Sequence, residues 1–403
     1  MASMTGPLAG LKVADFSRQM AGPFATQVMA DYGAEVLKVE SLPRGDPSRV
    51  TGVDFIEGES SLFLLWNRGK RSLALNMRTD EGLDIARRLI AEADIMLENF
   101  RPGVADTIGI GYEAMSKINP RLIYCSISGF GQDGPMAKAP ATDPIIQAMS
   151  GVMSVTGETD RERVLVGVPI ADFTGALLAV QGAMFGIIAR ERTGKGQRVD
   201  VSMLYGLMSA LNTRLASYWT TGKVPMPNGN AHTVVAPYQF FETSDGAAMA
   251  GVWGGDGWVR LCEAIGRPDL SDDPRFITNQ DRMENLEALV SILKPIIAEK
   301  SNDEWQELFS GAGALYGPLL NFAELFEHPQ VVHSGLLQSV EHASLGEIPQ
   351  LGPVVGMSDT PGEIKGPPPV LGQHTVEVLT EMGFSEDEIQ TLEASEVIRT
   401  TEI

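Results

Sequence analysis

The segment Leu11–Glu40 decides the fold. It reads LKVADF from Leu11 to Phe16, GPFATQVMADYGA from Gly22 to Ala34 and EVLKVE from Glu35 to Glu40. The two apolar runs are typical of buried strands, and the segment between them is typical of a helix with proline in its first turn and glycine at its end. A strand, a helix and a second strand of these lengths predict one β-α-β unit of a parallel sheet.

The same alternation continues along the first half of the chain. Strand-like runs are predicted at RSLALNM (71–77), DIMLENF (94–100), RLIYCSISGFG (121–131) and GQRVDVSM (196–203), and a helix with acidic residues in its first turn is predicted at 80–93. We therefore expect an α/β protein whose large domain is Rossmann-like, with an open and largely parallel sheet.

A chain of 403 residues is longer than a single hydrophobic core usually supports, so a second domain is expected. Prolines and glycines near 225–235 indicate a linker. We assign 1–224 to the large domain and 225–330 to a smaller α+β domain. The remaining segment, 331–403, is rich in Pro and Gly and contains two short acidic helices.

The charge of the chain limits the partners that it can have. With 31 Lys and Arg against 52 Asp and Glu, the net charge of −21 opposes binding to nucleic acid or to an anionic membrane. The N-terminus has no basic stretch followed by an apolar one, so no secretory signal is expected. The most apolar segment, Phe173–Ala189, contains Gln181 and is flanked by charges, so we interpret it as a core helix. Cys125 and Cys262 lie in apolar runs, which favours buried thiols in the cytoplasm.

Several common cofactor sites are missing from the sequence. No G-x-G-x-x-G follows the first strand and no Walker sequence occurs, so a nucleotide-dependent oxidoreductase is not supported. The five histidines show no metal-ligand spacing with cysteines or carboxylates. We expect no metal and no permanently bound cofactor.

Basic residues near the predicted carboxyl ends of strands are candidate phosphate contacts. NRGKRS carries Arg68, Lys70 and Arg71, and LENFRPG carries Arg101. In a doubly wound sheet the loops at the carboxyl ends of the strands form the ligand crevice. The alternative is a solvated run of charges. Lys38 lies inside an apolar strand and needs a partner, either Glu40 or a ligand phosphate.

Asp172 opens a long run of small and apolar residues, VPIADFTGALLAVQGAM (168–184). An aspartate there is either a helix N-cap or a working carboxylate. The second role is chemically possible, because an ionised carboxylate can attack an activated acyl group and nearby N–H groups can stabilise the oxyanion that forms. The residues alone leave both roles open.

Eight segments together resemble, in order and spacing, the class III coenzyme A transferases, the group of formyl-CoA transferase and carnitine CoA-transferase. The segments are PLAGLKVADFSRQMAGPFATQVMADYGAEVLKVESLPRGDPSR, NRGKRSLALNM, ENFRPG, SISGFGQDGP, TDPIIQAMSG, ADFTGALLAVQGAM, GQRVDVSM and PYQFFETSDG. The resemblance covers nearly the whole chain. It implies an interlocked, ring-like homodimer in which the large domain of each subunit is built from both chain ends.

The resemblance also implies an activity and site residues. Asp172 corresponds to the catalytic aspartate, which forms an anhydride with the acyl group and then an aspartyl-CoA thioester, and Gln19 corresponds to a glutamine near the thioester. Acyl-CoA and a carboxylic acid, such as a dicarboxylate, are the implied substrates. Matches to CoA-contacting segments are Lys38, Arg71, Asn99, Phe100 and Arg101. Gly254, Gly255 and Gly257 lie where relatives have a mobile glycine loop, although an ordinary turn fits as well.

Two other functions compete with this one. The α-methylacyl-CoA racemases of the same superfamily use a histidine where this chain has Thr142, and threonine cannot act as an imidazole base. A non-catalytic CoA-binding subunit is opposed by the presence of Asp172. For the distal carboxylate of a dicarboxylate, Arg18, Arg49 and His232 are candidates.

Overall fold

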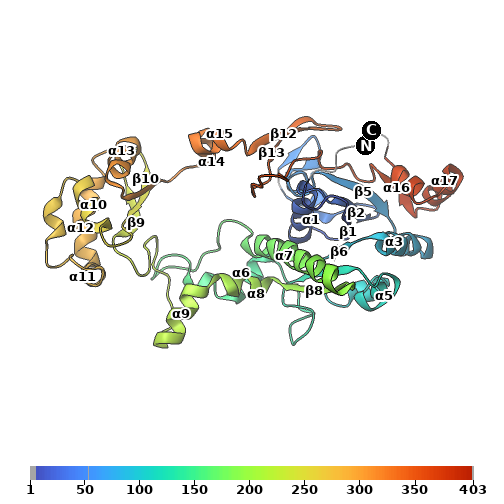
Figure 1. Ribbon diagram of the computed structural model, residues 1–403, viewed down its shortest axis with the longest axis horizontal. Coiled ribbons are helices and arrows are strands. Elements are labelled where there is room, and N and C mark those ends of the chain that lie inside the picture. The colour runs from blue at the N-terminus through green and yellow to red at the C-terminus, as the bar shows by residue number, and fades with distance from the viewer. Residues whose placement is uncertain (1–5, 53, 402–403) are drawn as a thin grey trace. The chain divides into compact units, whose positions relative to one another are not determined.

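The structure is a computed structural model that describes residues 6–52 and 54–401 (Figure 1). The chain divides into two compact units. The first contains the chain up to Val152, Val166–Ala216 and the chain from Gln330 onward, and the second contains Met153–Leu165 and Ser217–Pro329. Compared with the predicted boundaries, 153–165 and 217–224 group with the second unit instead of the first.

The first unit is built on a seven-stranded sheet with the order β14-β5-β2-β1-β6-β7-β8. The strands are β1 Lys12–Asp15, β2 Glu35–Ser41, β5 Lys70–Leu75, β6 Ile95–Glu98, β7 Ile123–Ser128, β8 Gln197–Ser202 and β14 Ile398–Arg399. Neighbouring strands are parallel, except that β14 runs antiparallel to β5. The predicted α/β class with a largely parallel sheet is therefore confirmed.

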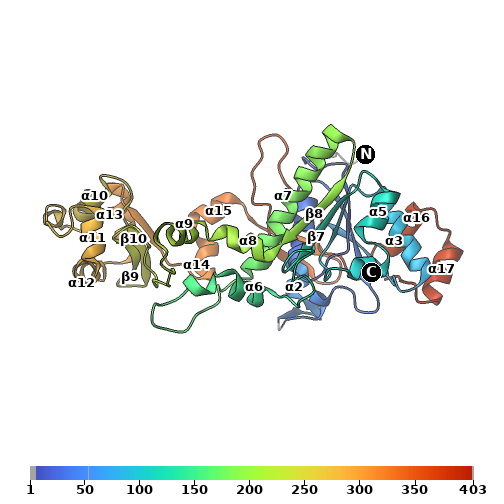
Figure 2. The same ribbon diagram turned by 90° about the horizontal axis from the view of Figure 1, so that it is seen from below.

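Helices cover both faces of this sheet, which explains why its central strands are apolar on both sides. Figure 2 shows α7 (Ile170–Thr193) on one side of the sheet and α3 (Asp80–Glu92), α5 (Tyr112–Ile118), α16 (Thr375–Glu381) and α17 (Glu386–Ala394) on the other. The helix α1 (Ala21–Asp31) packs with α7 in one core, and the remaining four helices enclose the second core.

The helix α7 approaches the sheet through small residues. Its buried positions include Ala171, Gly175, Ala179 and Ala183, each about one helical turn after the last. A Cβ atom at Gly186 would lie 2.8 Å from Ile123. Among the described residues α7 is also the one helix that is long and apolar enough to cross a membrane, by length and composition alone. Its contacts with α1, β7 and β8 bury one side of the helix, but only 33% of its most apolar stretch is buried, so α7 is less enclosed than the core helix that the sequence predicts.

The second unit has a three-stranded antiparallel sheet of order β11-β10-β9, with strands Leu315–Pro318, Ala247–Gly251 and Tyr238–Glu242. Its helices are α10 Gly257–Ala264, α11 Asn279–Glu284, α12 Leu286–Ile297 and α13 Asn302–Ala312. Trp305 and Phe309 lie at the centre of its own hydrophobic core. This arrangement agrees with the α+β character that the sequence predicts.

Several shorter elements complete the fold. They are β3 Phe55–Ile56, β4 Glu59–Ser60, β12 Leu337–His342, β13 Gly346–Leu351, α2 Ser61–Trp66, α4 Val104–Ile108, α6 Asp143–Ser150, α8 Met203–Ala210, α9 Asn212–Thr221, α14 Phe322–Glu327, α15 Pro329–Ser334 and three 3₁₀ turns, Pro47–Arg49, Met153–Val155 and Pro268–Ser271. The hairpin β12–β13 was not predicted.

The strand order creates a ligand crevice. The strand β1 stands between β2 and β6, so the chain crosses over in opposite directions on the two sides of β1. The loops that follow β1 and β6 therefore separate at the carboxyl edge of the sheet, where parallel α/β proteins bind their ligands.

Candidate active site

A cavity of about 670 Å³ opens at this carboxyl edge, entirely within the first unit. Its walls are the loop after β1, the loop after β6, the end of β7 and the starts of α6 and α7. Five residues predicted for catalysis or CoA binding line it together, and so does Arg18, a candidate for the distal carboxylate: the five are Gln19, Asn99, Phe100, Arg101 and Asp172. They come from three separate parts of the chain, so the fold brings them to one place. Their roles in catalysis and CoA binding stay predictions.

Asp172 stands in the first turn of α7, where the positive end of the helix dipole favours a negative charge. Even so, burial raises the pKa of Asp172 to about 6, and the nearby carboxylate of Asp143 adds to the increase. Among the described residues, the Asp172 carboxylate accepts no hydrogen bond. A half-buried carboxylate without a donor keeps its lone pairs available, as a nucleophile requires.

The helix-capping role belongs to Asp143, not to Asp172. Oδ1 of Asp143 accepts the backbone N–H of Ala171 at 2.6 Å and that of Asp172 at 3.3 Å. Its other oxygen accepts from Gln147 Nε2 at 2.7 Å, and Gln147 in turn holds the backbone N–H of Val166. Asp143, which belongs to α6, thus accepts the unpaired N–H groups at the start of α7. The side chain of Asp172 is therefore not needed as a helix cap.

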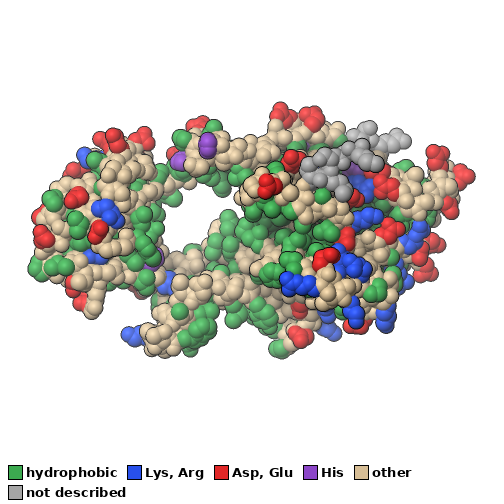
Figure 3. Space-filling view, in the orientation of Figure 1, with side chains coloured by type: hydrophobic (Ala, Val, Ile, Leu, Met, Phe, Trp, Pro, Cys, Tyr) green, Lys and Arg blue, Asp and Glu red, His purple; other side chains and the backbone are tan. Residues whose placement is uncertain are grey.

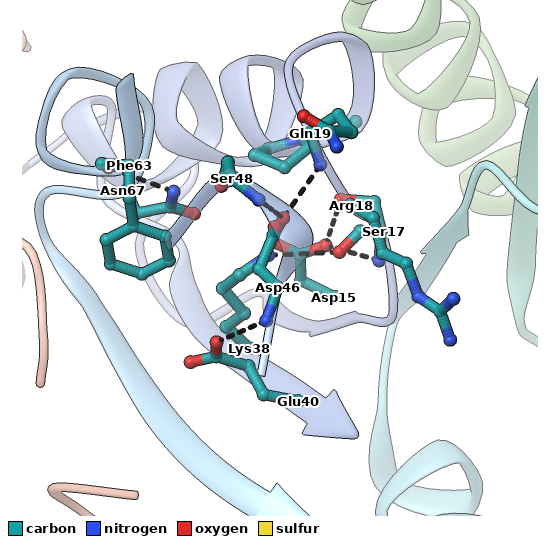
Figure 4. Close-up of polar contacts among 12 residues, drawn as sticks. Asp15, Ser17, Arg18, Gln19, Lys38, Glu40, Asp46, Ser48, Phe63 and Asn67 are labelled. Carbon is teal, nitrogen blue, oxygen red and sulfur yellow. Dashed lines mark hydrogen bonds and ion pairs between the residues drawn. The ribbon is translucent and has the colours of Figure 1, made fainter. Parts of the chain in front are cut away.

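Gln19 has a backbone conformation that is rare for its type. Its φ of 62° lies in the left-handed region, which costs a residue with a Cβ atom about 1 kcal/mol. Its N–H donates to Asp46 Oδ1 at 2.9 Å, as Figure 4 shows. This bond compensates the strain, and it fixes how the chain turns from β1 into α1 at the cavity wall.

The loop after β6 clamps the loop after β1. Asn99 accepts from Arg18 N and donates to Arg18 O, both at 2.8 Å. The Arg18 guanidinium lies 4.8 Å above the centre of the Phe100 ring. Arg101 is exposed at the rim of the cavity.

Arg18 itself is a cation without a carboxylate partner within 4 Å in the described part of the chain, and its Nη2 donates to Ser41 Oγ at 3.3 Å. Burial lowers the pKa of Arg18, although the charge of Asp46 opposes this effect. A partly desolvated guanidinium on a cavity wall suits an anionic group of a ligand.

Three cations predicted to contact CoA are instead buried in ion pairs. Lys38 pairs with Asp46 at 2.8 Å and Lys70 pairs with Asp15 at 3.1 Å, and all four side chains are fully buried. Arg68 pairs with Asp31 at 2.7 Å. The carboxylate that pairs with Lys38 is therefore that of Asp46, whereas Glu40 pairs with Arg49. This packing argues against a contact of Lys38, Arg68 or Lys70 with CoA.

Arg71 does not line the cavity of Asp172. Its guanidinium pairs with Glu377 and Glu381 of α16 and lines a separate cavity of about 660 Å³ with Lys12 and Arg88. Arg49, a candidate for the distal carboxylate, donates two hydrogen bonds to Glu40, both at 2.8 Å. Its guanidinium is therefore also paired with a carboxylate of the protein.

Gly254, Gly255 and Gly257 belong to the second unit, where the first two lie between β10 and α10 and Gly257 is the first residue of α10. A Cβ atom at Gly254 or Gly255 would meet nothing within 4 Å, so no close packing requires glycine there, although Gly254 has a φ of 80°. The same unit contains His232, which stacks on Tyr238 and meets Trp253 edge-on. Their part in a reaction stays a prediction.

Two residues of the site escaped the sequence analysis, Asp46 and Asp143. Each precedes a proline, Pro47 or Pro144, and each accepts backbone N–H groups at the start of a turn or helix. The Asp-Pro pair is a known signal for such capping and was the available clue. Within residues 6–52 and 54–401, no three His, Cys, Asp or Glu side chains gather as a metal site.

The fold and the cavity are those of an α/β enzyme with a carboxylate at its ligand crevice. Comparisons with known proteins identify which enzymes the chain is similar to. The chain is 39% identical to succinyl-CoA:glutarate CoA-transferase of Mus musculus over 97% of this chain and 90% of that protein. It is 40% identical to acetyl-CoA:oxalate CoA-transferase of Acetobacter aceti over 82% and 85%. The crystal structure of a CaiB/BaiF family protein from Brucella suis matches with a TM-score of 0.83 and 38% identity, over 94% of this chain and all of that one.

The sequence pattern of CoA-transferase family III matches residues 8–375. The chain therefore belongs to CoA-transferase family III, an enzyme family whose substrates are CoA thioesters. The resemblance to the class III transferases is confirmed.

Proposed function

We propose that this protein transfers coenzyme A from an acyl-CoA to a dicarboxylic acid through covalent intermediates on Asp172. The observation that carries the proposal is the Asp172 carboxylate, which lines the cavity, is half-buried and has no donor within the described chain. The names of the relatives support the acceptor class, since glutarate and oxalate are both dicarboxylates.

The reaction begins with attack of an Asp172 oxygen on the thioester carbonyl carbon. The C–S bond breaks, coenzyme A leaves as a thiolate and an acyl-aspartyl anhydride forms. The thiolate then attacks the aspartyl carbonyl carbon of this anhydride, which releases the donor as a carboxylate and leaves an aspartyl-CoA thioester. No proton is gained or lost in these steps.

The second half repeats the chemistry in reverse. A carboxylate of the acceptor attacks the aspartyl thioester, forms a new anhydride and releases the thiolate again. The thiolate attacks the acyl carbon of the acceptor, so the new acyl-CoA leaves and Asp172 is restored. Because every leaving group is a thiolate or a carboxylate, the sequence needs neither a metal nor a redox cofactor.

Asn99, Phe100 and Arg101 are the residues that we assign to CoA, because they form one wall of the cavity and Arg101 is an exposed cation on an acidic protein. Arg18 is the cation that we assign to an anionic group deeper in the same cavity. Gly254, Gly255 and Gly257 are assigned to a loop that shields the intermediate.

A homodimer is part of the proposal. Figure 3 shows hydrophobic side chains on the surface of α7 and α8. Phe185 and Ile188 of α7 and Tyr205 of α8 are each more than half exposed. Contiguous exposed apolar surface of this kind usually marks an interface between proteins. Both cysteines are free and buried, which supports the cytoplasm as the compartment.

The racemase alternative is opposed by the side chain at the start of α6. Thr142 is the residue before α6 and lines the cavity beside Asp143. A hydroxyl cannot replace imidazole as a base near neutral pH. A non-catalytic CoA-binding subunit makes the same contacts with CoA but leaves Asp172 unmodified.

The deciding experiment traps the intermediate. The protein is incubated with succinyl-, acetyl- and formyl-CoA, treated with hydroxylamine, and the modified peptide is mapped by mass spectrometry. A hydroxamate on Asp172, absent in Asp172→Asn and retained in the exposed control Asp133→Asn, supports the proposal. Deuterium uptake at the α-carbon of an acyl-CoA without labelling supports the racemase, and CoA binding without either reaction supports the non-catalytic subunit.

A further inference from the structure

The loop that leads from β1 into α1 has its backbone held almost entirely by side chains. Ser17 N donates to Asp15 Oδ1 at 2.9 Å, and Ser17 O accepts from Lys38 Nζ at 3.0 Å. Arg18 exchanges two hydrogen bonds with Asn99, and Gln19 N donates to Asp46. Figure 4 shows Lys38, Asp46 and Asp15 converging on this loop. Side chains from distant segments therefore set its shape.

Asp46 is the central residue of this group of side chains, because each of its two oxygens binds different partners. Oδ1 accepts from Gln19 N at 2.9 Å and from Ser48 N at 2.8 Å. Oδ2 forms the ion pair with Lys38 Nζ at 2.8 Å, and both side chains are 0% exposed. A fully buried ion pair is only weakly screened by solvent, so Lys38 holds the carboxylate in one orientation.

We propose that Asp46, oriented by Lys38, is a positioning residue of the transfer reaction. It holds Gln19 in the left-handed conformation and thereby places Gln19, Met20 and Ala21 on the wall of the cavity that contains Asp172. The inference rests on the proposed function for the reaction that it serves. It also gives Lys38 a role within the protein instead of a contact with CoA.

The negative charge of Asp46 is essential to this role. Asparagine in the same place keeps the size and one acceptor oxygen, but it leaves the buried ammonium of Lys38 without its carboxylate. The single oxygen of asparagine cannot serve both Lys38 Nζ and Gln19 N as the two carboxylate oxygens do. Gln19 N therefore loses its fixed acceptor, and with it the compensation for the strain at φ 62°. Gln19 is expected to relax toward negative φ and to move the cavity wall.

The first test compares two carboxylates that hold buried cations. Asp94 pairs with the buried Arg190 at 2.8 Å, and it precedes β6 at the amino edge of the sheet, opposite the cavity. Both Asp46→Asn and Asp94→Asn are expected to lower the melting temperature. Only Asp46→Asn is expected to lower kcat by about tenfold or more, because misplacement by about 1 Å can cost a hundredfold. Equal losses of kcat in the two variants would overturn the proposal.

The second test asks whether Asp46 acts through the backbone of Gln19. Gln19→Ala and Gln19→Gly both remove the side chain, but only glycine adopts a positive φ without strain. Asp46→Asn is therefore expected to lower kcat strongly in the alanine background and by less than a third as much in the glycine background. The same factor in both backgrounds contradicts the proposal, even if Asp46→Asn is less stable.

The outcome is separable from the proposed transferase activity. If the unmodified protein transfers no CoA, the proposed function fails, and calorimetric binding of free CoA to Asp46→Asn and to Asp94→Asn becomes the readout for the loop. Weaker binding in Asp46→Asn than in Asp94→Asn then still supports the positioning role, and equal binding overturns it.

Discussion

The carboxylate of Asp143 lies 3.3 Å from the backbone nitrogen of Asp172 and caps the helix that carries it. One aspartate thus takes the hydrogen bonds at the start of α7, while the other keeps its carboxylate free and has a pKa raised to about 6. The arrangement places a carboxylate with a structural role beside the carboxylate to which we assign the reaction.

The pH dependence of transfer follows from this pair. Asp172 must be ionised to attack, so kcat/KM is expected to fall below about pH 6. Asp143→Asn removes the nearby negative charge, so the pKa of Asp172 moves down toward its ordinary value and the acid limb moves to lower pH. Burial remains, and therefore part of the increase remains. A pH profile of kcat/KM measures the shift, and an acid limb that moves upward contradicts the assignment.

Glu98 provides the control for this profile. Its burial raises its pKa to about 7, so it titrates in the same range. It accepts the N–H of Phe100 and lies outside the cavity lining. Glu98→Gln is expected to leave the acid limb near pH 6.

Asp172 is expected to reduce the stability of the folded protein at neutral pH. Its folded pKa of about 6 lies above the value of 3.8 expected in the unfolded chain, so the folded state binds the proton more tightly. Stability therefore falls as the pH rises from about 4 to 6, and the cost persists above that range. Asp172→Asn is expected to raise the free energy of unfolding at pH 8 by about 1 to 3 kcal/mol, and by much less near pH 4. Urea unfolding at both pH values checks this, and a loss of stability at pH 8 counts against the pKa shift.

The sheet could be predicted because its strands carry a strong local signal. β5, β6 and β7 are buried along nearly their whole length, so each appears in the sequence as a short apolar run between helical segments. β14 has two residues and pairs with β5, more than 300 positions earlier, so no local pattern marks it.

The candidate site could be predicted only in part. Loops after parallel strands meet at one edge, which is why Gln19, Asn99 and Arg101 share a cavity with Asp172. The pairing of the basic residues with carboxylates of the protein could not be predicted from the sequence. The carboxylates that neutralise Lys38 and Lys70 lie in other segments of the chain. Whether a lysine faces a ligand or an aspartate depends on tertiary packing.

Arg101 and Arg71 test whether the basic segments contact the phosphates of CoA or carry charges with no part in binding. Arg101 lines the cavity of Asp172, whereas Arg71 is paired with Glu377 and Glu381 elsewhere. Arg101→Met is expected to raise KM for the acyl-CoA by about tenfold, because a charge-assisted hydrogen bond contributes roughly 1.5 to 3 kcal/mol. Arg71→Met is expected to change KM less than threefold. Steady-state kinetics with varied acyl-CoA decide, and a larger effect at Arg71 restores its predicted contact with CoA.

The close approach of α7 to the sheet depends on glycine at position 186. A Cβ atom there would lie 2.8 Å from Ile123 Cγ2, and the branched isoleucine is held in β7 and cannot easily move away. Gly186→Ala is therefore expected to lower the free energy of unfolding by about 1 to 3 kcal/mol through overpacking, although alanine is the better helix former. Gln181→Ala, on the exposed side of the same helix, is expected to change it by less than about 0.5 kcal/mol. Urea unfolding followed by circular dichroism measures both. If Gly186→Ala stabilises the protein, helix propensity outweighs packing, and α7 does not approach β7 as closely as the structure has it.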